Sequence, residues 1–220
     1  GGIGAIATQA FVSPLYGTDG IELLAAGAGA EEMLAAVTGR DAGRAQRQVH
    51  AIDAVGHSAA FTGADCIDWA GHLVGTGVSV AGNMLAGPRV IEATLECYQT
   101  HSGLPFVERL LTAMEAGERA GGDKRGRQSA ALKIVQGEAY PWLDIRSDDH
   151  GDPLAELRRL YAVAQERFLY FAELLPTADN VAGLLDRREV DARIAAAEAA
   201  RAAEGRASAS CATEPSESGN

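Results

Sequence analysis

The sequence predicts an α+β fold in which paired helices cover layered antiparallel sheets. Apolar residues at period two mark short strands that follow one another as hairpins, and apolar residues at helical spacing mark helices that come in pairs. The composition, with 47% hydrophobic and 22% charged residues, is that of a globular protein. Because strands and helices are grouped rather than alternating, we do not expect a doubly wound parallel sheet.

The first half of the chain contains four expected strands and two helices, separated by turn-forming residues. Alternating small apolar residues begin a strand that stops before Pro14, and Thr18 or Asp19 is suited to cap the next helix. The turn Asp53–Gly56 joins two later strands as a hairpin. The expected elements are a strand at 3–12, helices at 18–24 and 30–37, and strands at 46–53, 58–62 and 73–81.

The second half repeats this grouping with longer helices. Pro105 suits the first turn of one helix, and Asp152 followed by Pro153 is the usual pair of a cap and a first helical residue. The expected elements are helices at 90–99 and 105–119, strands at 129–135 and 142–147, and a helix at 153–176.

The chain is expected to form one folded domain at 1–175, followed by two peripheral segments. Residues 176–206 read as a solvated helical extension, in which Val190 and Ile194 are the apolar anchors of an Ala-, Glu- and Arg-rich helix. Residues 207–220 contain almost no bulky apolar side chain, so they cannot bury enough surface to offset chain entropy. We expect that tail to be disordered.

Charge and cysteine content narrow the classes of partner and compartment. Thirty acidic against 19 basic residues give a net charge of -11, which repels nucleic-acid phosphates and anionic lipid. No apolar run approaches the roughly 18 residues that cross a bilayer. Cys66, Cys97 and Cys211 are widely spaced, which favours reduced thiols in the cytoplasm and offers no zinc site.

We therefore expect a small-molecule substrate or ligand, no nucleic-acid or membrane partner, and no cofactor or metal. A homo-oligomer is left open. The first residue is Gly1 rather than Met, so a signal peptide upstream is left open as well.

Residues 121–129 form the most informative polar stretch. One interpretation is a helix end, with a glycine after the last turn and basic residues near the negative end of the helix dipole. The other is a loop whose amides and basic side chains bind a carboxylate or phosphate. On the second interpretation, Asp123, Arg125 and Gln128 hold the polar head of a substrate. Ser129 does not lie in a GxSxG turn, so it is not expected to be a nucleophile.

Residues 144–150 gather three carboxylates, a guanidinium and an imidazole. A solvated turn before the capping residue Asp152 explains much of this pattern. Alternatively, Asp148, Asp149 and His150 supply acid–base groups or ligands for Mg²⁺ or Mn²⁺, which would make the protein a metal-dependent hydrolase. Alternate residues of a strand share a face, so the cluster is not one preformed cage.

Other motifs favour ordinary structural roles. The GxGxxA pattern at 2–7 lies within a strand rather than at a strand-to-helix turn, which argues against a dinucleotide site. Asn83 follows a glycine after a strand, as is usual in turns. His72 is more often a packing residue than a catalyst.

Taken together, these motifs resemble the bacterial DUF1028 family, a domain of unknown function, over about residues 1–160. The matching stretches are 4–9 (GAIATQ), 14–17 (PLYG), 47–48 (RQ), 62–66 (TGADC), 69–72 (WAGH), 82–83 (GN), 108–111 (ERLL), 116–117 (AG), 121–131 (GGDKRGRQSAA) and 144–153.

The resemblance implies an N-terminal-nucleophile hydrolase-like fold, an αββα sandwich, and an amidohydrolase or acylase acting on a small, carboxylate-bearing amide. In such enzymes the α-amine of the nucleophile acts as the base, so the nucleophile and a first core strand are expected upstream of Gly1. Supporting catalytic candidates are Gln9, Asn83 and Asp123, and substrate-binding candidates are His72, Arg125, Gln128, Ser129, Asp148, Asp149 and His150. The alternative is a non-catalytic domain that binds a small anion on the same fold.

Overall fold

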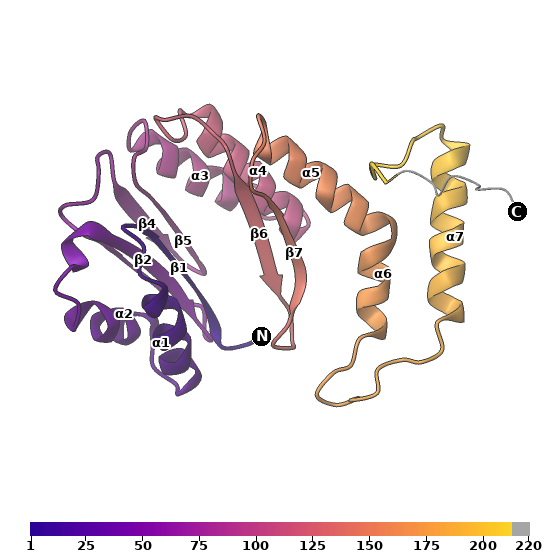
Figure 1. Ribbon diagram of the computed structural model, residues 1–220, viewed down its shortest axis with the longest axis horizontal. Coiled ribbons are helices and arrows are strands. Elements are labelled where there is room, and N and C mark those ends of the chain that lie inside the picture. Colours follow the sequence, from indigo (N-terminus) through magenta and orange to yellow (C-terminus); the bar gives the residue numbers. More distant parts are fainter. Residues whose placement is uncertain (213–220) are drawn as a thin grey trace, which may run out of the picture. The chain divides into compact units, whose positions relative to one another are not determined.

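The computed structural model describes residues 1–212 and divides the chain into two compact units, Gly1–Arg127 and Gln128–Asn220 (Figure 1). Both units combine helices with small antiparallel sheets, which confirms the α+β class.

Two antiparallel sheets form the centre of the first unit. The three-stranded sheet has the order β1-β2-β3, and β4 and β5 form a separate hairpin. The register places Gln9 opposite Gln48 and His50 opposite Ala60. The strands are β1 (Gly4–Ala10), β2 (Arg47–Asp53), β3 (Ser58–Thr62), β4 (Gly71–Gly75) and β5 (Val78–Gly82).

Helices lie on the outer faces of these sheets. Helices α1 and α2 contact the three-stranded sheet on one face, and the β4–β5 hairpin contacts β2 and β3. Helix α3 contacts the hairpin and pairs with α4 (Figure 1). The helices are α1 (Pro14–Ala25), α2 (Ala30–Gly39), the short 3₁₀ turn η1 (Arg44–Gln46), α3 (Arg89–Thr100) and α4 (Phe106–Arg119).

The main core of this unit lies between α1, α2 and the three-stranded sheet. Its central side chains are fully buried, among them Met33, Val37 and Val49. Helix α1 packs closely at Gly20, where an added Cβ would lie 2.7 Å from Ile6 Cδ1 and 2.9 Å from Met33 Sδ. A Cβ at Gly17 of the same helix would meet nothing within 4 Å. Gly20 therefore sets how closely α1 approaches the sheet.

The structure corrects two expected boundaries. The strand expected at 73–81 is the hairpin β4–β5, because Gly77 adopts a φ of +69° that allows the chain to reverse. Helix α1 begins at Pro14 rather than near Thr18, since proline has no N–H to satisfy and its fixed φ suits the first helical turn.

The second unit begins with the hairpin β6 (Ala130–Val135) and β7 (Pro141–Ser147), on which α5 (Pro153–Val163) packs. The cap expected at Asp152 is confirmed, because its carboxylate accepts a hydrogen bond of 3.1 Å from the backbone N–H of Ala155. The helical path continues through a π-helical segment (Ala164–Phe168), α6 (Leu169–Phe171) and a 3₁₀ turn (Ala172–Leu174).

The last helix, α7 (Arg188–Ala203), matches the extension expected from the sequence. Both anticipated anchors, Val190 and Ile194, are buried. Beyond it, residues 207–212 form no helix or strand, and the Ala209 N–H donates to Glu166 at 2.7 Å. The rest of the expected disordered tail, 213–220, lies outside the described residues.

Candidate functional site

A polar layer lies between the two sheets of the first unit. Alternation along β2 places Val49 and Ala51 toward the helices, so Gln48 and His50 face the β4–β5 hairpin. Both polar residues contact that hairpin directly. The layer is therefore built from polar side chains where an apolar interface would be expected.

Gln48 is the centre of this layer and is fully buried. Its Nε2 lies 2.8 Å from Thr62 Oγ1 and 3.0 Å from the carbonyl oxygens of both Gly71 and Gly82. Its Oε1 accepts a hydrogen bond of 3.1 Å from Gln9 Nε2. An amide group has only two hydrogens for these three acceptors, so one bond is shared. One side chain thus joins all five strands of the unit.

Thr62 extends this network to His72. The Thr62 hydroxyl, which accepts from Gln48, lies 2.8 Å from His72 Nδ1. The hydroxyl can donate its own hydrogen to Nδ1 while it accepts from Gln48, and a neutral imidazole paired in this way carries its proton on Nε2. Burial lowers the pKa of His72, which favours that neutral form. The rest of the His72 side chain is exposed.

A second imidazole–hydroxyl pair lies in the same layer. His50 Nδ1 is 3.0 Å from Ser79 Oγ, which joins β2 to β5. Burial lowers the pKa of His50, and the nearby His72 lowers it further. Both histidines are therefore disposed to be neutral at neutral pH.

The glycine-rich stretch after α4 forms a loop that is fastened to the segment following β5. Leu85 and Asp123 form an antiparallel bridge, and the Lys124 N–H donates to the Met84 carbonyl at 2.9 Å. The Lys124 ammonium donates to the Asp68 carbonyl. The loop therefore has defined neighbours within the first unit.

Charged groups in this loop are paired with one another. Asp123 accepts from Arg125 Nε at 2.9 Å and from Nη2 at 2.6 Å, and these bonds lower the pKa of the carboxyl. Arg127 lies 3.7 Å from Glu118. An anion binding at Arg125 would have to compete with Asp123.

Several of the expected site residues meet in this unit. Gln9 and His72 belong to one hydrogen-bonded network through Gln48 and Thr62. Asn83 is half-buried and directly follows Gly82, whose carbonyl belongs to that network.

Other expected site residues lie in the second unit. Gln128 Nε2 donates to Asp149 Oδ1 at 3.1 Å, and the His150 N–H donates to the Gln128 carbonyl at 2.9 Å. Asp148 instead accepts from Arg146, at 2.9 Å from Nη2. Ser129, Asp148, Asp149 and His150 are all exposed. The structure thus joins Gln128 to Asp149 and His150, and directs Asp148 to a different partner.

A separate polar cluster lies beside α1. The Tyr16 hydroxyl donates to Asp41 Oδ2 at 2.6 Å, and Arg47 also donates to this carboxylate. These bonds lower the pKa of Asp41 from 3.8 to about 2. Burial and the bond to Asp41 raise the pKa of Tyr16 to about 12. The cluster borders a hollow of about 380 Å³.

Comparisons with known proteins decide the family. A model described as "Family of unknown function (DUF1028)" matches residues 1–157. The chain belongs to the DUF1028 family. The crystal structure of protein SPO2555 from Silicibacter pomeroyi, described as belonging to DUF1028, shares 34% sequence identity with a TM-score of 0.77. The match covers 84% of this chain and 80% of that one. No curated protein matches the chain.

Two further properties of this DUF1028 chain concern membranes and metals. Residues 1–212 contain no helix long and apolar enough to span a bilayer. Within the same described part, no group of three or more His, Cys, Asp or Glu side chains is arranged to hold a metal ion. The metal-dependent interpretation of Asp148, Asp149 and His150 therefore has no ligand set in the described residues.

The site residues predicted from the sequence did not include four members of this polar layer, Gln48, His50, Thr62 and Ser79. One signal was present, since Gln48 and His50 occupy the same face of an otherwise apolar strand. The partners of that face could not be identified, because the hairpin β4–β5 was expected to be a single strand.

Proposed function

We propose that this DUF1028 protein hydrolyses an amide bond of a small substrate where Gln9, Gln48, Thr62 and His72 meet. The proposal is supported by the order of layers within residues 1–127, which is helix pair, sheet, sheet and helix pair, as in the N-terminal-nucleophile hydrolases that the family resembles. The observation that carries it is the hydrogen-bonded path from buried Gln48 through Thr62 to exposed His72.

His72 has a specific role in this proposal. Its Nε2–H donates to the carbonyl oxygen of the scissile amide and stabilises the negative charge that develops there. A neutral imidazole can do this when its other nitrogen accepts a hydrogen bond, and Thr62 supplies that bond. Gln48 holds Thr62 through a hydrogen bond of 2.8 Å, and the side-chain amides of Gln9 and Asn83 are proposed as further donors.

In this proposal Gln9, Gln48, Thr62 and His72 position the substrate and stabilise charge, and none of them is the nucleophile.

The test is hydrolysis of a panel of N-acyl amino acids and short peptides by the purified protein. His72→Ala should lower kcat by about 10²-fold or more, as removal of an oxyanion donor does. His72→Gln, which keeps an N–H donor, should recover part of the rate. Thr62→Val, which removes the hydroxyl partner of Nδ1, should lower kcat with little change in KM.

Two results would contradict the proposal. If the wild-type protein hydrolyses no member of the panel, amide hydrolysis is rejected for these substrate classes. If the panel is hydrolysed and His72→Ala has an unchanged kcat/KM, the role of His72 is wrong. His57→Ala serves as the matched control, because His57 is an exposed histidine that is bonded to neither Thr62 nor Gln48.

The non-catalytic alternative, binding of a small anion at residues 123–127, has weaker support. Arg125 already makes two side-chain hydrogen bonds to Asp123, and Arg127 lies beside Glu118. Lys124 is engaged by a backbone carbonyl. A basic loop satisfied by its own neighbours gains less from an incoming anion than one with unpaired cations.

A further inference from the structure

Strand β3 forms an edge of the three-stranded sheet, and part of its backbone lacks a partner. The Asp53 N–H donates to the His57 carbonyl and the Gly63 N–H to the Arg47 carbonyl, which shows that odd-numbered residues of this segment face β2. In an antiparallel pair the alternate residues face outward. The backbone N–H and C=O groups of Ser58, Ala60 and Thr62 therefore point away from β2. No described residue pairs with them.

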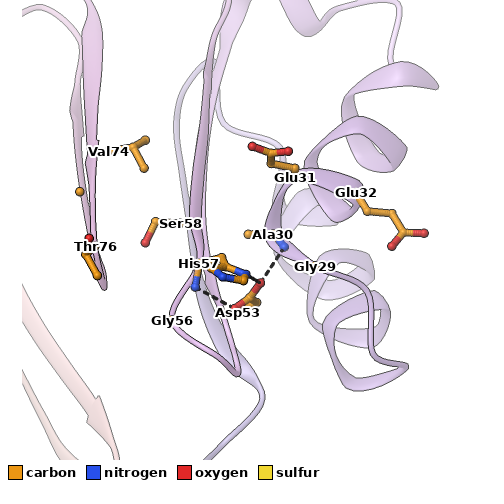
Figure 2. A pocket seen from close by; sticks show the side chains of 11 residues that line it. Gly29, Ala30, Glu31, Glu32, Asp53, Gly56, His57, Ser58, Val74 and Thr76 are labelled. Carbon is orange, nitrogen blue, oxygen red and sulfur yellow. Dashed lines mark hydrogen bonds and ion pairs between the residues drawn. The ribbon is translucent and has the colours of Figure 1, made fainter.

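A groove follows this open edge. It consists of two adjoining hollows of about 760 and 390 Å³, which share Glu31, Ser58 and Val74. Helix α2 lines one side, and β4 with its turn lines the other (Figure 2). An extended chain lying on the edge of β3 would thus have a wall on each face.

One hydroxyl in the groove also lacks a partner. The Oγ atom of Ser58 is buried and makes no hydrogen bond, although Ser58 lines both hollows. Figure 2 shows this side chain between β3 and Val74 of β4. Buried polar atoms are nearly always satisfied in folded proteins. A polar group of an occupant would satisfy this one.

The charges along the groove favour a cationic occupant. Glu31 lines both hollows and Glu32 lines the larger one, and Figure 2 shows Glu31 on the strand side of α2. The buried Asp53 carboxylate accepts from the N–H groups of Val55 and His57 at 3.0 and 2.9 Å. His57 is the basic side chain among the lining residues, and it pairs with Asp53 at 3.6 Å.

We propose that the groove binds an extended peptide segment carrying a lysine or arginine, which adds to β3 as a further strand. Hydrogen bonds to the backbone of Ser58 and Ala60, which line the groove, supply the sequence-independent part of binding. Side chains that face α2 meet Glu31, which selects the basic residue, and alternate side chains face Val74. This site is distinct from the proposed hydrolase function and does not depend on it.

The experiment measures binding of fluorescent peptides to the purified chain by polarisation. The probe is a short, capped peptide that alternates Thr and Val around a central Lys. One matched peptide has Glu in place of Lys, and another has N-methyl groups on alternate backbone nitrogens. The Lys peptide should bind with saturation, and the Glu peptide should bind at least about fivefold more weakly. Methylation of the set of alternate nitrogens that face β3 should abolish binding, because these nitrogens donate the hydrogen bonds to the strand.

Variants of the protein locate the site. Glu31→Gln should weaken binding of the Lys peptide about three- to fivefold, the effect expected for a partly exposed ion pair. Glu22→Gln is the matched control, because Glu22 is an exposed glutamate of α1 that lines neither hollow, and it should leave the affinity unchanged. Ala60→Pro removes one outward N–H without removing a bond to β2, so it should abolish binding while the melting temperature confirms folding.

Three results would overturn the proposal. The first is the absence of saturable binding by the Lys peptide. The second is equal binding of the Lys and Glu peptides, or equal binding by wild type, Glu31→Gln and Ala60→Pro. The third is concentration-dependent self-association that Ala60→Pro abolishes, because a second copy of the chain would then occupy the edge. The N-methyl peptides test backbone pairing on the wild-type protein, so the conclusion does not depend on the folding of any variant.

Discussion

Replacing Gln48 by Leu should destabilise the first unit by about 2–3 kcal/mol. The side chain is fully buried and takes part in four hydrogen bonds, to Gln9, Thr62 and the carbonyls of Gly71 and Gly82. At a net value of about 1 kcal/mol each, their loss costs roughly 3–4 kcal/mol. Leu has a similar volume and regains about 1 kcal/mol through its apolar surface.

Gln9→Leu provides the comparison, because it removes only the bond of 3.1 Å between Gln9 and Gln48. We expect it to cost about 1 kcal/mol. If that bond is all that Gln9 contributes, the double variant should be no less stable than Gln48→Leu alone, and the coupling energy should be about 1 kcal/mol.

The assay is urea unfolding followed by tryptophan fluorescence. The chain has two tryptophans, Trp69 in the first unit and Trp142 in the second, so a Trp142→Phe background reports the first unit alone. A cost below about 1 kcal/mol for Gln48→Leu would refute the reasoning, since it would mean that water or rearrangement satisfies the groups left behind.

Three other predictions concern local stability. Asp41, whose pKa falls from 3.8 to about 2 on folding, stabilises the fold above pH 4 and loses this contribution as the pH falls toward 2. When acid unfolding is followed by circular dichroism, Asp41→Asn should therefore lose less stability over that pH interval than the wild type. An unchanged dependence of stability on pH would contradict this prediction. Gly20→Ala should lower the free energy of unfolding by about 1–3 kcal/mol through overpacking. Gly17→Ala in the same helix should raise it by about 0.5–1 kcal/mol. Urea unfolding measures both, and the opposite order of stability would show that α1 shifts to accommodate the added methyl group. Asp152→Ala should lower the stability of the second unit by about 1 kcal/mol, because α5 loses its N-terminal cap. Thermal melting with Trp142 as the reporter measures the change. An unchanged melting temperature would mean that another group replaces the cap.

Helices and strands that are marked by a local sequence pattern could be predicted. The pair Asp152–Pro153 marked the start of α5, the alternation at 46–53 marked β2, and the turn that follows it marked the returning strand β3. The anchors Val190 and Ile194 were the apolar side chains available to bury α7. In each case the signal lies within a few residues of the feature it predicts.

Features that depend on contacts between distant parts of the chain were harder to predict from the sequence. The hairpin β4–β5 was mistaken for one strand, because Gly75 and Gly77 were interpreted as weak points in a strand rather than as a turn. The division between Arg127 and Gln128 has no compositional signal in the basic stretch that spans it.

The candidate site shows the same contrast. Gln9 and His72 were singled out by resemblance, but the residues that connect them, Gln48 and Thr62, were not. Gln128 comes from the basic stretch and Asp149 and His150 from the acidic one, and they meet because β6 pairs with β7, whereas Asp148 pairs with Arg146.

The spacing of neighbouring side chains was enough to predict most of the helices and strands and the apolar face of each, because these properties arise locally. It did not determine that a buried glutamine would face a threonine and two carbonyls from other strands, or that the outer edge of β3 would border an acidic groove. Those arrangements required the sheets to be stacked in one register, since only packing brings groups far apart in the chain within hydrogen-bonding distance.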